Sequence, residues 1–177
     1  NRLIYDNNNN NALGLPGNGP VRTEGSAATG INDVDKAYTY AGYTYDFYWT
    51  YYNRDSLDGN GMSLISTVRY CDPSYSCPYQ NAFWNGSQMV YGDGDEDQPV
   101  ADRIFNRFTI AIDVIGHELT HGVTQYTAKL AYSYQSGALN ESMSDVFGSL
   151  VKQYGLQQTA DQDPHCQGDD RHGKDPV

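Results

Sequence analysis

The sequence predicts an α+β fold, and three observations predict it. Residues 64–70 alternate apolar and polar side chains as a strand does. Residues 79–94 contain two β-prone runs around an Asn-Gly turn signal, which indicates a hairpin. Two other segments place apolar side chains at helical spacing instead. They are residues 32–53 and a segment from about Thr109 to residue 127. At 177 residues the chain can form one domain, or one domain and part of a second.

The composition excludes two classes of partner. The net charge is −11 and the pI is near 4.5, which argues against nucleic acid because phosphate binding needs clustered Lys and Arg. No apolar run reaches about eighteen residues, so we expect no membrane-spanning segment. No basic-then-apolar signal segment opens the chain, which is expected of a processed chain or of one never targeted in this way.

The first thirty residues read as short strands joined by loops. Residues 3–5 and 21–25 are expected strands, separated by a polar run at 7–11 and by Pro-Gly and Gly-Pro turn signals. Asn32 is the expected N-cap of the helix that follows, and this helix should end near Asn53. Its inward stripe has the spacing of a core face rather than of a binding groove: Val34, Ala37, Tyr38, Ala41, Tyr45, Tyr48 and Tyr52.

Three cysteines are too few for a disulfide framework. Cys71 and Cys77 bracket five residues and can close a short disulfide loop, which would fit an oxidising compartment. Free buried thiols are the equally weighted alternative. Cys166 has no evident partner in either case.

The chain is organised around the sequence His-Glu-Leu-Thr-His at residues 117–121. His117 and His121 are four residues apart, so on a helix they lie on the same face and can bind one cation. Two histidines at this spacing with Glu118 beside the first form a hydrolytic zinc signature. Glu118 can take a proton from a zinc-bound water as general base. The alternative is two solvent-facing histidines on an ordinary helix.

A second motif, Asn-Glu-Ser-Met-Ser-Asp at residues 140–145, supports the zinc hypothesis. A catalytic zinc has three protein ligands and one open position, and Glu141 follows His121 by twenty residues, enough for a second helix to return. Asp145 lies one turn after Glu141, where it can accept a hydrogen bond from a ligand histidine and fix its tautomer.

The segments HELTHGVTQYTA and SGALNESMSDVFG closely resemble the thermolysin family of metallopeptidases, with features of the protealysin-like branch. The resemblance implies one catalytic zinc ion and peptide-bond hydrolysis. It also implies a zincin-like lobe with a twisted antiparallel sheet and a central HExxH helix at residues 1–127. Residues 128–177 would then begin a helical second domain, with a helix from Gly137 to about Tyr154 and an irregular tail. The implied zinc ligands are His117, His121 and Glu141, with Glu118 as base and Asp145 and Asn140 supporting the ligands.

The same resemblance assigns residues to substrate. Tyr132 would stabilise the oxyanion, its alternative being an ordinary core tyrosine. The strand around Asn81, Ala82 and Trp84 would be an edge strand that pairs with extended substrate. The alternative for this segment is a hairpin with a packed aromatic pair.

The sequence departs from the family at three places. Asp113 matches a family calcium ligand, but Lys152 stands where its acidic partner is expected, so we expect the calcium site to be absent or weakened and Lys152 to pair with Asp113. Glu96 replaces a usual glycine in an acidic loop. After Leu156 the family continues into a large helical domain that is not found here, and His165 and His172 of the tail are expected to be solvent-exposed.

The resemblance therefore implies a secreted zinc metalloendopeptidase acting on polypeptides, and the composition predicts no nucleic-acid or membrane partner. Its own second lobe or a propeptide are further candidate partners. The main alternative is a truncated, weak or inactive zinc-binding fragment. In the family the helical second domain supplies transition-state donors, and losing such donors costs about 10²–10³ in turnover each. A third alternative is that the second lobe exists as a separate chain.

Overall fold

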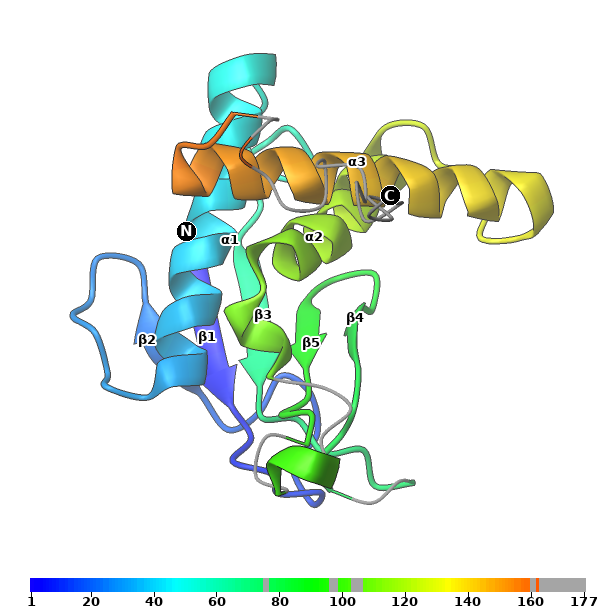
Figure 1. The fold of residues 1–177 in the computed structure, drawn as a ribbon. Coiled ribbons are helices and arrows are strands. Elements are labelled where there is room, and N and C mark those ends of the chain that lie inside the picture. Colours follow the sequence, from blue (N-terminus) through cyan, green and yellow to red (C-terminus); the bar gives the residue numbers. More distant parts are fainter. Residues whose placement is uncertain (75–76, 96–98, 103–106, 160–161, 163–177) are drawn as a thin grey trace, which may run out of the picture.

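The computed structural model describes residues 1–74, 77–95, 99–102, 107–159 and 162 (Figure 1). Within them, five strands form one sheet in the order β2-β1-β3-β5-β4. The strands are β1 (Arg2–Asp6), β2 (Pro20–Thr23), β3 (Leu64–Val68), β4 (Ala82–Trp84) and β5 (Met89–Tyr91). The helices are α1 (Asn32–Tyr52), α2 (Ile112–Tyr126) and α3 (Tyr134–Leu156), with 3-10 turns η1 (Val100–Asp102) and η2 (Phe108–Ile110). The predicted α+β class is confirmed.

The sheet is mixed, so the prediction of an antiparallel sheet was wrong in its strand directions. β1 pairs with β2 and β4 with β5 antiparallel, whereas β3 is parallel to both β1 and β5. Parallel neighbours need long connections, and the chain supplies one through α1 and another through residues 69–88. The predicted hairpin at 79–94 is confirmed, and β4 lies at the sheet edge as expected.

Helix α1 differs from the prediction at its start and at the end of its predicted buried stripe. Asn32 is the first helical residue, and no side chain caps the helix at its N-cap, Ile31. Asp35 instead reaches back, and its carboxylate accepts hydrogen bonds from the backbone N–H groups of Thr29 and Gly30. The helix ends at Tyr52, beside Asn53 in the left-handed conformation (φ 48°), close to the predicted end. Of the predicted stripe, Val34, Ala37, Tyr38, Ala41 and Tyr48 are buried, while Tyr52 is exposed.

Both later helices begin at other residues than predicted. Helix α2 begins at Ile112 rather than Thr109, because the 3-10 turn η2 and an extended Ala111 (φ −98°, ψ 108°) precede it. The side chains of Thr109 and Arg107 in this segment hydrogen-bond to the buried carboxylate of Asp33 in α1. Helix α3 begins at Tyr134, before the predicted Gly137, and ends at Leu156, just beyond the predicted Tyr154.

Helix α2 lies between the sheet and α3 (Figure 1). Its Ile115 and Leu119 are buried in the core with residues of β1, β3, β5 and α1. On its other side, α2 approaches α3 at Gly116 and Gly148. A Cβ atom on Gly148 would lie 2.6 Å from the carbonyl oxygen of Asp113 and 3.0 Å from the backbone nitrogen of His117. The glycines therefore allow the two helices that carry both motifs to touch.

Cys71 and Cys77 form a disulfide, with a Cα–Cα distance of 5.4 Å, so the first of the two cysteine alternatives holds. The bond lies in the segment between β3 and the edge strand β4. Glu96, His165, Cys166 and His172 lie outside the described residues. No helix within the described ranges has the length and apolar character needed to cross a bilayer.

Candidate metal centre

Three side chains from two helices converge on one point. The Nε2 atoms of His117 and His121 in α2 lie 3.1 Å apart. Glu141 of α3 places Oε2 3.2 Å from Nε2 of His117 and Oε1 3.6 Å from Nε2 of His121. The histidine side chains are only 18% and 12% exposed, so the alternative of two solvent-facing histidines is wrong.

The opposite ring nitrogens are held by α3. Nδ1 of His117 lies 2.8 Å from Oδ1 of Asp145, and Nδ1 of His121 lies 2.8 Å from Oδ1 of Asn140. Both oxygens are acceptors, so each Nδ1 carries the proton and each Nε2 presents its lone pair to the shared point. The hydroxyl of Ser144 also lies 3.0 Å from Nδ1 of His121, a contact that the sequence analysis missed. Its signal was present, because Ser144 follows Asn140 by one helical turn.

This arrangement fits a zinc ion. Tetrahedral zinc with ligand bonds of about 2.0–2.1 Å separates its ligand atoms by about 3.3 Å. The three observed separations run from 3.1 to 3.6 Å. Two imidazole nitrogens with one carboxylate oxygen suit zinc better than calcium or magnesium, which prefer oxygen ligands alone. Such a set leaves a fourth position for water or substrate.

Glu118 lies beside this point without belonging to the ligand cluster, which the structure limits to His117, His121 and Glu141 among its described residues. The pKa of its carboxyl is raised to about 7, chiefly by burial and to a smaller extent by the Glu141 carboxylate, against the lowering effects of His117 and of the Trp84 N–H. That backbone N–H donates a hydrogen bond of 3.1 Å to Oε2 of Glu118. Glu118 can therefore hold or release a proton near neutral pH.

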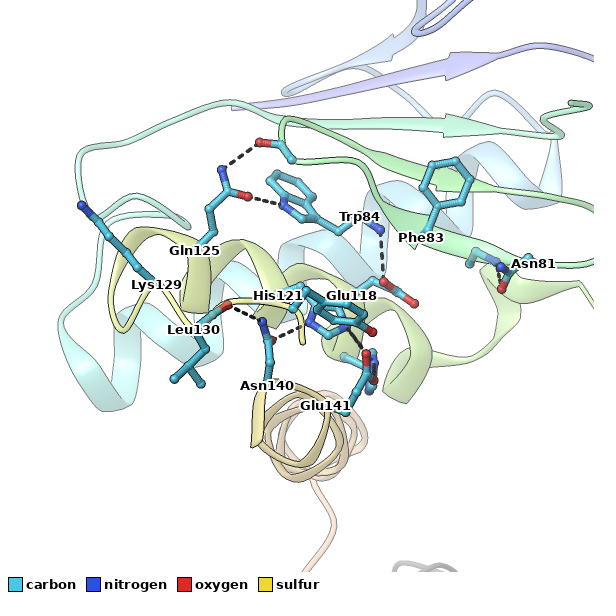
Figure 2. Close-up of a pocket in the computed structure, with 14 residues that line it drawn as sticks. Asn81, Phe83, Trp84, Glu118, His121, Gln125, Lys129, Leu130, Asn140 and Glu141 are labelled. Atoms are coloured by element: carbon cyan, nitrogen blue, oxygen red, sulfur yellow. Dashed lines mark hydrogen bonds and ion pairs between the residues drawn. The ribbon is translucent and has the colours of Figure 1, made fainter. Parts of the chain in front are cut away.

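The centre opens into a cavity of about 840 Å³ (Figure 2). One wall is β4, which contributes Ala82 and Trp84 with the preceding Asn81. Tyr132 lines the cavity, is 70% exposed, and its ring centroid lies 5.9 Å from that of His121. Tyr132 is thus no core tyrosine. All the side chains singled out for zinc, base, oxyanion and substrate lie at one cavity.

Gln125 is a contributor that the sequence analysis missed. Its Oε1 accepts a hydrogen bond of 2.9 Å from the indole Nε1 of Trp84, and its Nε2 donates one of 3.1 Å to the carbonyl oxygen of Gly86 (Figure 2). Gln125 follows His121 by one helical turn, so its place on the zinc face was available from the sequence. Because the Gln125 amide both accepts and donates a hydrogen bond, it links the β4–β5 hairpin to α2.

The ion pair expected at the candidate calcium position is present. Nζ of Lys152 donates a hydrogen bond of 3.0 Å to Oδ2 of Asp113, which links α3 to α2.

Comparison with known proteins matches two family models to this chain. The thermolysin metallopeptidase catalytic domain matches residues 3–125, and the thermolysin metallopeptidase alpha-helical domain matches residues 128–175. An extracellular metalloprotease of Pectobacterium carotovorum subsp. carotovorum is 55% identical over 92% of this chain and 43% of its own length. Protease PrtS of Photorhabdus sp. (strain Az29) is 52% identical over 91% of this chain and 40% of its own.

A solved structure is also similar. The precursor of protealysin, a metalloproteinase from Serratia proteamaculans, superposes with a TM-score of 0.79 at 56% identity. The match covers 91% of this chain and 46% of the precursor. The chain thus spans less than half the length of these relatives.

Proposed function

Because the chain belongs to the thermolysin family of metallopeptidases, we propose that it hydrolyses internal peptide bonds as a zinc-dependent endopeptidase. One observation carries the proposal. The His117, His121 and Glu141 ligand atoms, each within 4.8 Å of the others, share a cavity with the half-buried Glu118 carboxylate and the edge strand β4.

His117, His121 and Glu141 would hold the zinc ion, with Asp145 on His117 and Asn140 on His121 keeping each Nε2 aimed at it. Zinc, when bound, supplies Lewis-acid polarisation of the substrate carbonyl and lowers the pKa of coordinated water.

Glu118 would take the proton of the attacking water at its carboxylate and later pass it to the leaving amine. The Trp84 N–H orients this carboxylate through its bond to Oε2. Tyr132, exposed at the mouth of the cavity beside His121, would donate a hydrogen bond from its hydroxyl to the developing oxyanion.

The outer edge of β4 would receive the substrate. No described strand pairs with β4 on the side away from β5, so an extended peptide can add there through main-chain hydrogen bonds at Ala82. The Asn81 carbonyl accepts from the Gly92 N–H on the β5 side, so Asn81 would contribute its side-chain amide. Trp84 would shape the floor, held by Gln125. Main-chain pairing demands little of the substrate sequence, as suits an endopeptidase.

The test is hydrolysis of an internally quenched peptide with a central Phe-Leu bond, with zinc added or chelated. We expect zinc-dependent cleavage that Glu118→Gln abolishes while zinc binding is retained. Asp102→Asn is the matched control, since it makes the same carboxylate-to-amide change on an exposed side chain outside the cavity. Equal cleavage by Glu118→Gln and the wild-type chain would refute the role of Glu118.

A second candidate function is an inactive zinc-binding fragment or one half of a two-part enzyme. The observation that favours it is a row of exposed apolar side chains on α3: Leu139, Met143, Val146 and Leu150. Their 4-3-4 spacing forms one stripe, as on a helix that packs against a further element. One bound zinc per chain without cleavage would support this candidate, and cleavage restored by the helical lobe of a relative would identify the missing part.

We further propose that residues 1–127 and 128–177 belong to two lobes, which the separate matches to a catalytic domain at 3–125 and to an alpha-helical domain at 128–175 support. Secretion is supported by the name of the Pectobacterium relative and by the Cys71–Cys77 disulfide, which suits an oxidising compartment. A propeptide as partner is supported by the likeness to a precursor structure.

We also propose that the Lys152 ammonium takes the place of a calcium ion at Asp113. Calcium should then leave the melting temperature unchanged, and Lys152→Glu should create a calcium-dependent rise. A calcium-dependent rise in the wild-type chain would contradict the proposal.

A further inference from the structure

A second cavity lies on the molecule, and it shares no lining residue with the metal centre. It has a volume of about 470 Å³ and lies where the C-terminal turns of α3 cross α1 (Figure 1). Gly155 makes the crossing close, since a Cβ atom there would lie 2.5 Å from Cδ2 of Tyr43. The ring of Tyr43 thus packs on the backbone of α3.

Three tyrosine rings form the walls of this cavity: Tyr43, Tyr51 and Tyr154. The rings of Tyr51 and Tyr154 meet almost at a right angle, with centroids 5.9 Å apart and an interplanar angle of 80°. Such a corner presents ring surface from two directions to one small guest. Ring faces carry partial negative charge, so they attract cations.

The polar groups of the cavity are acceptors. Asp46 is the one charged residue among its lining residues, and it is exposed at the rim. Oε1 of Gln158 is buried and has no hydrogen-bond partner within the described part of the chain. A buried acceptor left unpaired costs about 1–3 kcal/mol, so a turn of the Gln158 side chain that brings Oε1 to a ligand N–H in the cavity would relieve it.

The helix ends make the electrostatic potential at the cavity more negative. The C-terminal end of α3 carries partial negative charge, and neither α1 nor α3 has a basic residue in its last turn. The site therefore combines aromatic faces, a carboxylate and an unpaired carbonyl. No cation is among the residues that line it, although Asp46 also lines a neighbouring cavity with Arg2 and interacts with that guanidinium.

We propose that this cavity, defined by Tyr43, Asp46, Tyr51, Tyr154 and Gln158, binds a primary alkylammonium group, the chemistry of a lysine side chain or of a free alkylamine. The rings would enclose the methylene groups and the charge, and the N–H groups would donate to Asp46 and, once the Gln158 side chain turns toward the cavity, to its Oε1. A quaternary ammonium has no N–H for Gln158, and a neutral alkyl group gains nothing from the carboxylate. Binding is independent of peptide hydrolysis.

The test is a titration of the 177-residue protein with n-butylammonium, followed through backbone amide resonances. We expect saturable shifts confined to residues 43–51 and 153–158, and weaker binding of tetramethylammonium and of the neutral 1-pentanol. The capped tripeptide Ac-Gly-Lys-Gly-NH2 separates the two sources. Binding at least as tight as that of n-butylammonium assigns the site to a polypeptide lysine, and weaker binding assigns it to free amines.

Variants make the assignment specific. Tyr51→Leu should weaken n-butylammonium binding about 5-fold or more by removing one ring face, and Asp46→Asn should weaken it as well. Trp49→Leu is the matched control, because Trp49 is exposed on the same helix but does not line the cavity. Tyr51 is 64% exposed, so its replacement should leave the fold intact. Equal shifts with 1-pentanol, tighter binding of tetramethylammonium, or no saturation would overturn the proposal.

Discussion

Gly148→Ala tests whether the close approach of α2 and α3 builds the metal centre. The added methyl group would meet the carbonyl oxygen of Asp113 at 2.6 Å and Cβ of His117 at 3.2 Å. An ordinary contact requires α3 to move away by roughly 0.5–0.8 Å, since well-packed interiors cannot absorb a methyl group in place. Glu141 lies two turns earlier on the same rigid helix and would move with it.

The displacement exceeds what the centre tolerates, because ligand distances at metal sites hold to about 0.2 Å. We therefore expect zinc affinity to fall about 10–100-fold, the size of effect seen when ligand orientation is disturbed. The change in stability is smaller. Overpacking costs about 1–3 kcal/mol, while alanine regains up to about 1 kcal/mol over glycine within a helix.

Zinc affinity is measured by competition with a chromophoric chelator, and stability by urea unfolding of the zinc-free protein. Gly14→Ala is the matched control, because no atom lies within 4 Å of a Cβ placed there and its φ is not positive. If Gly148→Ala binds zinc as tightly as the control does, the argument that helix proximity sets the ligand geometry is refuted.

Three further changes test separate contacts. Asp145→Ala removes the acceptor 2.8 Å from Nδ1 of His117 and should weaken zinc binding about 10-fold. This is the low end of such effects, because the Asp145 side chain is 75% exposed. Unchanged zinc affinity would show that Asp145 does not orient His117. Arg2, by hydrogen bonding, lowers the pKa of Glu24 from 4.5 to about 2. The pair therefore stabilises the fold above pH 4.5 and loses this effect as the pH falls toward 2. The difference in urea midpoint between wild type and Glu24→Gln should shrink over that range. A constant difference would contradict the expected pH dependence of stability. Cys71→Ser opens a short loop and should cost about 2 kcal/mol of unfolding free energy, with reductant lowering the melting temperature of the wild type but not of the variant.

The sequence alone determined the parts of the centre that lie within one helix. His117 and His121 share a face of α2 because four residues make about one turn, and the same rule places Asn140 and Ser144 together on α3. It applies equally to Gln125, which was overlooked although it follows His121 by the same spacing. Local spacing also predicted the hairpin of β4 and β5 and most of the buried stripe of α1.

Tertiary structure alone decided how those parts meet. The contact at Gly116 and Gly148, which brings Glu141 within 3.6 Å of both histidines, joins residues far apart in the chain. Contacts between residues far apart in the chain also include the parallel pairing of β3 with β1 and β5 and the hydrogen bond from Thr109, just before α2, to Asp33. The tyrosine cavity between α1 and α3 also arises from such contacts. Periodicity reports which face of an element is apolar but not which element covers it, because that choice depends on the packing of all the others.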